Sequence, residues 1–437
     1  MQTNFSSEAL SDPAQAASEA IIRKCVHCGF CTATCPTYVL LGDELDSPRG
    51  RIYLIKDMLE NETTPTAKVV KHIDRCLSCL SCMTTCPSGV NYMHLVDHAR
   101  TYIERSYRRP WHERFLRSLL AAVLPYPRRF RAALALARLV RPFGPLLARS
   151  AMTRPAAAML ALAPGRISSR STAHSGNSAG TRGRIALLQG CAEPVLRPEI
   201  RAATVRVLER AGYETVFASG EVCCGALTHH MGKERPTLAA IHRNVDAWTR
   251  LIEEGGLTAI AVTTSGCGTM IKDYGFILRD DPDYADRARQ VSEMTKDISE
   301  LLLDADLSEG DGRGLVVAYH AACSLQHGQR VSEAPRRVLT ASGYAVRTPV
   351  EAHLCCGSAG TYNIFQPVIA GQLGDRKAAN LDRLGTDVIA TGNIGCSLQI
   401  GGRSITPVVH LIELVDWATG GPCPAELAHL ATERIGS

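Results

Sequence analysis

The sequence lacks the features of a secreted or membrane-spanning protein. Residues 1–19 contain no cationic start followed by an apolar run, so no secretory signal is visible. No apolar run reaches the roughly 18–20 residues that a membrane helix needs, because arginines and prolines interrupt every candidate. The seventeen cysteines are therefore expected to stay reduced, unlike the disulfide framework of a short secreted chain. We expect a cytoplasmic protein whose thiols are available to metals.

Two further absences narrow the function. No G-x-G-x-x-G follows a predicted strand and opens a helix, so the dinucleotide-binding fingerprint is missing. No cysteine lies between Cys86 and Cys191, and within this interval residues 105–170 carry fourteen arginines against one acid, Glu113. The composition, with 45% hydrophobic and 21% charged residues, is otherwise that of a folded chain of about three domains.

Eight cysteines are crowded into two copies of one motif. Residues 25–36 read CVHCGFCTATCP and residues 76–87 read CLSCLSCMTTCP, both C-x2-C-x2-C-x3-C-P. In this ferredoxin spacing three thiolates hold one [4Fe-4S] cluster and the fourth cysteine ligates the other cluster. Structural zinc sites, the alternative, usually place two C-x2-C pairs roughly a dozen or more residues apart. The predicted ligands are Cys25, Cys28, Cys31 and Cys86 for one cluster, and Cys76, Cys79, Cys82 and Cys35 for the other.

Other polar residues accompany these motifs. His27, inside the first motif, is expected to be a partly exposed loop side chain rather than a ligand. Four basic residues could raise the potential of an anionic cluster, or could simply be solvated surface side chains. They are Arg23, Lys24, Lys71 and Arg75.

The arginine-rich interval is predicted to be helical. Residues 115–124 and 130–140 read as short basic amphipathic helices, and prolines interrupt the pattern after each. These helices either pack on the flanking domains or form a surface for anionic lipid or an acidic partner. A polar stretch of small residues follows at 168–183, where we place a linker and a domain boundary.

The second half of the chain is expected to consist of βα units. Short apolar runs alternate there with helical periods. The expected strands lie at residues 185–188, 216–218 and 259–262, and the expected helices at 198–211 and 236–253.

This half also contains an internal duplication. Four cysteines recur at offsets of 132, 132, 132 and 129 residues: Cys191, Cys223, Cys224 and Cys267 correspond to Cys323, Cys355, Cys356 and Cys396. A period of this length indicates a pair of similar domains. The expected fold class is therefore α+β, with a helical two-[4Fe-4S] ferredoxin-type domain followed by two duplicated α/β cysteine-rich repeats. The expected domains are residues 15–105, a basic helical connector and linker at 106–183, and the repeats at 184–312 and 313–437.

The segment at residues 25–56, CVHCGFCTATCPTYVLLGDELDSPRGRIYLIK, resembles the iron-sulfur subunit of glycolate oxidase, also called glycolate dehydrogenase. The second motif and the two duplicated domains, each with a Cys-Cys-Gly (CCG) motif at residues 223–225 or 355–357, extend this resemblance over nearly the whole chain. It implies that the eight cysteines named above carry over as ligands of two [4Fe-4S] clusters, and that flavin is bound by other subunits.

The resemblance also implies a role. Flavin-binding partner subunits would oxidise glycolate to glyoxylate, and this chain would relay the electrons towards the quinone pool from the cytoplasmic face of the inner membrane, as a peripheral protein without a nucleic-acid partner. The chain alone would not oxidise glycolate. The alternatives are the corresponding subunit of a lactate or glycerol-3-phosphate dehydrogenase complex, and a non-catalytic redox sensor or zinc scaffold.

The CCG motifs resemble the cysteine-rich domains of heterodisulfide reductase, which hold non-cubane iron-sulfur clusters. In that family the last cysteine belongs to a C-x2-C pair, but Met270 and Gln399 stand where its final ligand is expected. These cysteines either bind a further metal centre or are small buried hydrophobic residues near Gly-rich turns. The histidines near the motifs are expected to be core or surface residues: His229, His230, His320 and His353.

Overall fold

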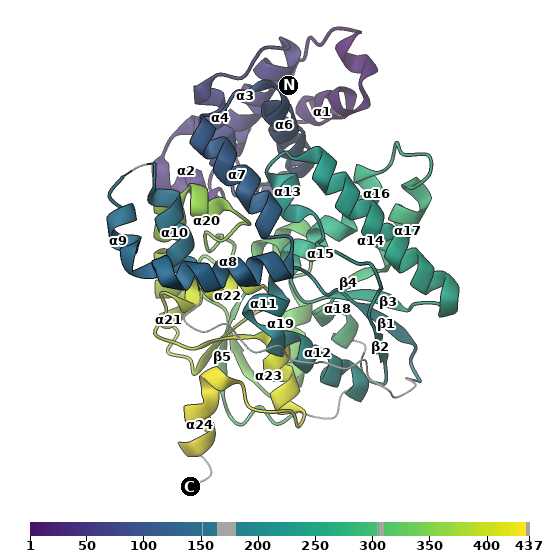
Figure 1. Ribbon diagram of the computed structural model, residues 1–437, viewed down its shortest axis with the longest axis vertical. Coiled ribbons are helices and arrows are strands. Elements are labelled where there is room, and N and C mark those ends of the chain that lie inside the picture. Colours follow the sequence, from purple (N-terminus) through teal and green to yellow (C-terminus); the bar gives the residue numbers. More distant parts are fainter. Residues whose placement is uncertain (151, 164–180, 304, 306–309, 434–437) are drawn as a thin grey trace.

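The computed structural model describes residues 1–150, 152–163, 181–303, 305 and 310–433. The N-terminal helices form one end of the molecule, and two parallel sheets lie at the other (Figure 1). The predicted fold class is thereby confirmed, because a helical region precedes two α/β repeats. Within the described part of the chain, no helix is long and apolar enough to cross a membrane. The predicted linker at 168–183 falls mostly outside the described residues.

The N-terminal region is built from short helices around one apolar core. Its helices are α1 (Pro13–Arg23), α2 (Pro36–Leu41), α3 (Pro48–Glu60), α4 (Ala67–Asp74), α5 (Ser81–Thr85) and α6 (Tyr92–Ser106), with 3-10 turns η1 (Ala9–Ser11) and η2 (Glu44–Asp46). Ser47 caps α3 and Thr66 caps α4, each accepting a backbone N–H from the first turn. Ile55 and Leu95 are fully buried in this core, which also includes the thiol of Cys76.

In its described residues the connector contains four helices and a 3-10 turn, and the two predicted amphipathic helices are present. The connector contains α7 (Trp111–Val123), α8 (Pro127–Val140), η3 (Arg141–Phe143), α9 (Gly144–Leu147) and α10 (Arg154–Leu162). Helix α8 runs across the front of the molecule in Figure 1, where Leu134 packs on Val195 of the first repeat. Helices α8 and α9 also leave many large apolar side chains exposed.

Each repeat contains a four-stranded parallel sheet. The first has the order β2-β1-β3-β4, with β1 (Arg184–Leu187), β2 (Glu214–Val216), β3 (Ala259–Val262) and β4 (Thr295–Asp297). The second has the equivalent order β6-β5-β7-β8, with β5 (Val316–His320), β6 (Ala345–Arg347), β7 (Val388–Thr391) and β8 (Val408–His410). The shared order supports the duplication that the cysteine offsets predict. The expected strand at 216–218 begins earlier, at Glu214, because register with β1 pairs Glu214 with Arg184.

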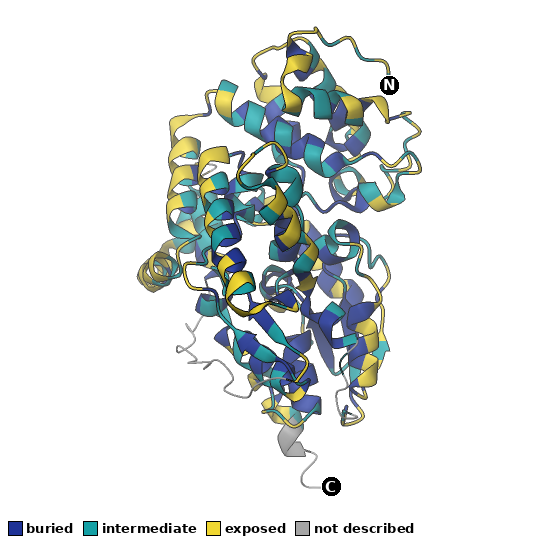
Figure 2. Ribbon diagram, turned by 90° about the vertical axis from the view of Figure 1, so that its right-hand side faces the viewer, coloured by how far each residue is buried: buried dark blue, intermediate teal, exposed yellow. Residues whose placement is uncertain are grey.

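Helices surround both sheets, whose strands are largely buried (Figure 2). In the first repeat they are α11 (Glu193–Leu196), α12 (Pro198–Arg210), α13 (Ala226–His230), α14 (Glu234–Gly255), α15 (Ser265–Lys272), α16 (Tyr274–Ile277), α17 (Ala285–Met294) and α18 (Ile298–Leu303). In the second they are η4 (Ser324–Gly328), α19 (Ala334–Ala341), α20 (Tyr362–Phe365), α21 (Pro367–Asp382), α22 (Ile394–Gly401), α23 (Leu411–Ala418), η5 (Ala425–Leu427) and α24 (Ala428–Glu433). The expected helices at 198–211 and 236–253 correspond to α12 and α14.

The two repeats pack on one another through a shared core. Helix α12 of the first repeat lies against α23 of the second, and one apolar cluster includes residues from both sheets. Buried Asp416 on α23 pairs with Arg206 and Arg210 on α12. Arg197 reaches Glu413 with a separation of 2.9 Å between Nη2 and Oε2. The repeats therefore form one unit on which the N-terminal region rests.

Candidate functional site

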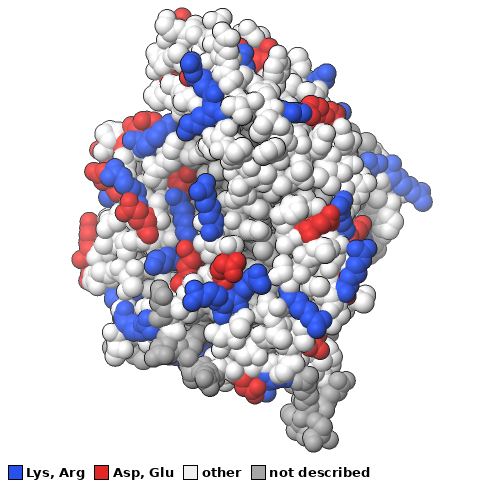
Figure 3. Space-filling model, turned by 180° about the vertical axis from the view of Figure 1, so that it is seen from behind, with Lys and Arg blue, Asp and Glu red and all other residues white. Residues whose placement is uncertain are grey.

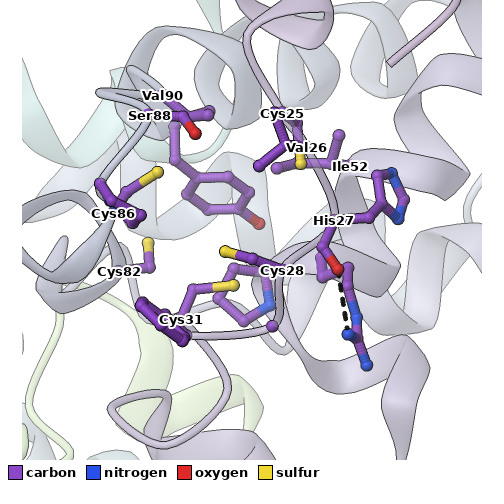
Figure 4. Close-up of a pocket in the computed structure, with 16 residues that line it drawn as sticks. Cys25, Val26, His27, Cys28, Cys31, Ile52, Cys82, Cys86, Ser88 and Val90 are labelled. Atoms are coloured by element: carbon purple, nitrogen blue, oxygen red, sulfur yellow. Dashed lines mark hydrogen bonds between the residues drawn. The ribbon is translucent and has the colours of Figure 1, made fainter.

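The N-terminal cysteines line two neighbouring cavities. The first cavity receives Cys25, Cys28 and Cys31 from the first motif, and Cys82 and Cys86 from the second. Figure 4 shows the sulfurs of Cys28, Cys31, Cys82 and Cys86 facing a common space. Apolar and ring side chains form much of the remaining lining, to which Arg49 and Ser88 also contribute; the apolar and ring residues include Val26, Pro48, Ile52, Val90 and Tyr92.

The second cavity has the complementary set. Cys76, Cys79 and Cys82 of the second motif line it together with Cys35 of the first. The fourth cysteine of each motif thus lies with the first three of the other motif, and Cys82 borders both cavities. The four cysteines predicted for each cluster therefore line one cavity together, and their assignment as cluster ligands stays a prediction. Thiols are soft donors, and four of them around one cavity match the needs of an iron-sulfur cluster.

The two cysteine loops share an unusual backbone conformation. His27 and Gly29 of the first motif have φ of 56° and 85°, and the corresponding Ser78 and Leu80 have φ of 50° and 61°. The left-handed conformation costs a non-glycine residue about 1–2 kcal/mol. Its recurrence at the same two positions indicates that both loops are shaped to turn successive sulfurs inward. His27 is partly exposed, as expected for a loop side chain.

Three thiols in these cavities, those of Cys31, Cys79 and Cys82, have raised pKa values. Burial, followed by the nearby Cys79, raises the pKa of the Cys82 thiol. Burial also raises the pKa of Cys79, and it raises that of Cys31 to about 11. Because iron binds the thiolate form, cluster assembly in these cavities must release protons.

A buried ionic network supports the second cavity. Asp46 is fully buried and accepts from Arg75 Nη1 at 2.7 Å, from His72 Nδ1 at 2.9 Å and from Arg51 Nη2 at 3.4 Å. Nη1 of Arg51 also lies 3.8 Å from the sulfur of Cys35. Both carboxylate oxygens of Asp46 already contact these arginine and histidine side chains. Asp46 therefore stabilises the ionic network and is not available as a metal ligand.

Sequence reasoning missed Arg51. Arg51 is 1% exposed and places its charge beside the predicted ligand Cys35, whereas Arg75 contacts Asp46, the carboxylate that it shares with Arg51. The available signal was the segment LGDELDSPRGRIYLIK, which contains both Asp46 and Arg51. Arg23 and Lys24 are exposed, as solvated side chains would be.

The cysteines of each repeat converge at the carboxyl ends of its strands. In the first repeat the sulfurs of Cys191 and Cys223 are 3.4 Å apart. In the second, the Cys323–Cys355 sulfur distance is 3.7 Å. The sulfurs of Cys356 and Cys396 are 3.3 Å apart. Cysteine side chains therefore lie in contact with one another in each repeat. Cysteines that served only as scattered core residues would not be expected to do so.

The second repeat lies directly against the second cavity. Leu77, Cys79 and Cys355 belong to one apolar cluster, and Cys323 packs against it. Thr84 and His327 approach within 2.8 Å across this boundary, between Oγ1 and Nδ1. Cys323 and Cys355 of the second repeat therefore lie close to the cysteines of the second cavity.

The first repeat contacts the N-terminal region through polar groups. Buried Asp97 faces His229 and His230 at 3.3 and 3.5 Å. Nε2 of His94 lies 2.8 Å from Oδ1 of Asp273. His229 and His230 thus have an ionic partner at a domain boundary and belong to the structure.

Comparisons with known proteins agree with this arrangement. Family models identify a 4Fe-4S dicluster domain at residues 24–90 and a cysteine-rich domain at 185–272 and again at 317–401. The chain is 42% identical to the glycolate oxidase iron-sulfur subunit of Escherichia coli, over 96% of this chain and 99% of that protein. It is 31% identical to the probable glycolate oxidase iron-sulfur subunit of Bacillus subtilis, over 92% and 95%.

Two further proteins are related over a shorter length or by fold alone. Lactate utilization protein A of Bacillus licheniformis is 28% identical over 53% of this chain and 99% of its own length. The crystal structure of a hypothetical protein from Helicobacter pylori has a TM-score of 0.54 at 11% identity, covering 95% of this chain and 74% of that chain. This last comparison concerns the fold only.

Proposed function

This chain belongs to the family of glycolate oxidase iron-sulfur subunits, and we propose that it relays electrons from a partner flavoprotein that oxidises glycolate to glyoxylate towards the quinone pool. The observation that supports this most strongly is the Escherichia coli relative, which matches over almost the full length of both chains. The two cysteine-lined cavities supply the chemistry. A [4Fe-4S] cluster in each would accept and pass on one electron at a time.

We propose ligands that cross between the motifs. Cys25, Cys28, Cys31 and Cys86 hold the first cluster, and Cys76, Cys79, Cys82 and Cys35 hold the second. The lining of the two cavities supports this division, because Cys86 reaches only the first and Cys35 only the second.

The exposure of the two cavities suggests a direction of electron flow. Cys28 in the first cavity is exposed, and its neighbours Val26 and Phe30 are 65% and 61% exposed. Cys35 and Cys79 in the second cavity are buried. A partner can therefore approach the first cluster closely, and we place electron entry there, with the second cluster as the inner relay.

A lactate or glycerol-3-phosphate complex is a weaker alternative. The lactate utilization relative matches about half of this chain, whereas the two glycolate oxidase relatives match more than nine-tenths of it. A zinc scaffold is disfavoured by the matching dicluster model.

Copurification of the chain with its partners, followed by metal and sulfide analysis, tests the function. We expect a flavin-containing partner, with about eight iron atoms and about eight sulfides for each copy of this chain. Visible absorption should bleach on reduction, which zinc cannot imitate. The variant Cys423→Ser is a matched control, because Cys423 lies outside both cavities and should leave the iron content unchanged. A colourless protein that contains zinc would refute the proposal.

We further propose that the connector holds the complex at the cytoplasmic face of the inner membrane. Not all of its arginines are available, because buried Arg109 and Arg117 pair with acids such as Glu104. Others project into solvent near exposed apolar side chains, including Leu139 at 74% and Phe143 at 60% exposure. On the opposite face of the molecule, Figure 3 shows basic and acidic side chains interspersed. Basic helices with exposed apolar residues are typical of interfacial membrane binding.

Replacing Arg128, Arg141 and Arg149 by glutamine should weaken binding to anionic vesicles by at least about tenfold at low salt. These arginines are exposed and form no ion pair with a described residue. Cosedimentation of the purified chain with phosphatidylglycerol vesicles measures the effect, and added salt should weaken wild-type binding too.

The control variant removes three positive charges from the repeats instead of the connector. Lys296, Arg336 and Arg337 are exposed residues of the repeats, and their replacement by glutamine should leave vesicle binding unchanged. Equal binding by the connector variant and the wild type at low salt would mean that the connector arginines do not contact lipid.

A further inference from the structure

A buried group of two thiols and one imidazole lies at the carboxyl end of the second sheet. His320 ends β5, Cys356 follows β6, and Cys396 lies in the first turn of α22, after β7. Each of the three residues is only 1% exposed. One ligand atom from each residue lies within 4.8 Å of the other two. Three different segments of the repeat therefore place soft donor atoms at one point.

The imidazole of His320 has no nitrogen or oxygen partner among the described residues. Both of its ring nitrogens are buried, and neither meets the geometry of a hydrogen bond within this part of the chain. A buried polar group without a partner destabilises a fold, and such groups in native proteins usually have a functional reason. The side chain that lies beside the ring is Cys356, a second potential metal ligand.

The duplicated scaffold does not need a histidine at this position. The offset of 132 residues that relates Cys224 to Cys356 puts Leu188 opposite His320. Leu188 is buried in the apolar core of its own repeat. Because a leucine fills the equivalent position in the first sheet, packing alone does not explain the histidine in the second repeat.

We propose that His320, Cys356 and Cys396 bind a single thiophilic divalent cation, Zn²⁺, as a third metal centre of this chain. Two thiolates and one imidazole are ordinary zinc ligands, and a fourth tetrahedral position remains for water or another thiolate. The ion does not change oxidation state. It fixes the ends of three segments beside Cys355 and Cys323, which pack against the second cavity.

The spacing favours one ion over a further cluster. No three of the eight N-terminal cysteines, all within the described chain, bring their sulfurs within the 4.8 Å that His320, Cys356 and Cys396 satisfy. A cluster requires its thiolates to spread around several iron atoms, whereas one tetrahedral ion requires donors that nearly touch. The group in the second repeat has the compact arrangement.

Zinc analysis and zinc-edge X-ray absorption of the purified full chain, prepared anaerobically with its iron, test the proposal. We expect about one zinc for each chain, with zinc–sulfur and zinc–nitrogen distances of about 2.3 and about 2.0 Å. Both His320→Leu, which installs the residue of the first repeat, and Cys396→Ser should lose the zinc and keep the iron. The matched control Cys267→Ser, in the first repeat, should keep both metals.

Three results would overturn the proposal. A wild-type chain without stoichiometric zinc excludes the site directly, whatever the stability of the variants. Retention of zinc by a folded His320→Leu chain removes the histidine from the coordination sphere. Iron beyond the two clusters, lost on substitution of His320 or Cys396, would show that this group binds an iron centre instead.

Discussion

Replacing Cys35 by serine should remove the cluster of the second motif, although Cys35 belongs to the first. The sulfur of Cys35 lines the cavity formed by Cys76, Cys79 and Cys82, and it is buried beside Arg51. A serine hydroxyl is a poor ligand for iron compared with a thiolate. We expect a loss of about half of the iron, and a redox titration followed by electron paramagnetic resonance should show one cluster signal in place of two.

The reciprocal variant is the control for this prediction. Cys86→Ser should affect the cluster of Cys25, Cys28 and Cys31 and leave the second cluster intact, because Cys86 lines the first cavity. Damage confined to the motif that contains the substituted cysteine would contradict crossed ligation. The two variants together therefore distinguish crossed from local ligand sets.

The purified chain, with both clusters in place and no flavin, should not oxidise glycolate. Removal of hydrogen from a 2-hydroxy acid transfers two electrons, whereas each cluster takes one, so the reaction needs a hydride acceptor such as flavin. The sequence contains no dinucleotide-binding fingerprint. Glycolate-dependent reduction of a dye should remain at the level of the blank.

This negative result requires a positive control on the same preparation. Chain reduced chemically beforehand should pass its electrons to the dye rapidly, which shows that the clusters are competent. Dye reduction that depends on glycolate would place a catalytic site in this chain and would contradict the division of work with a flavoprotein.

The cysteine grouping was predictable because the ligand spacing is a local property. Two-residue gaps determine how three sulfurs can face one cluster, and the ferredoxin pattern assigns the fourth to its neighbour. The duplication was predictable for a different reason. The offset between Cys191 and Cys323 equals that between Cys224 and Cys356, as expected when a whole domain is duplicated. The two sheets accordingly have the same strand order.

Features that depend on tertiary contacts could not be predicted. Arg51 reads as an ordinary basic residue of a helix, and only the fold places it between Asp46 and Cys35. The strand β4 is short and polar, so its sequence shows no hydrophobic periodicity. It is recognised as a strand only through its parallel pairing with β3. His320 was expected to be a core or surface residue. It is a core residue, but its environment of thiols is visible only in three dimensions.

The measurement that tests the central claim most directly is stopped-flow reduction of the assembled complex containing Cys79→Ser. Cys79 lines the second cavity and lies against the second repeat. The account predicts that glycolate bleaches the flavin of the partner at the wild-type rate, while reduction of a quinone analogue falls to background. Cys423→Ser should retain both activities. Quinone reduction at the wild-type rate, in a complex shown by electron paramagnetic resonance to lack the second cluster, would contradict the account.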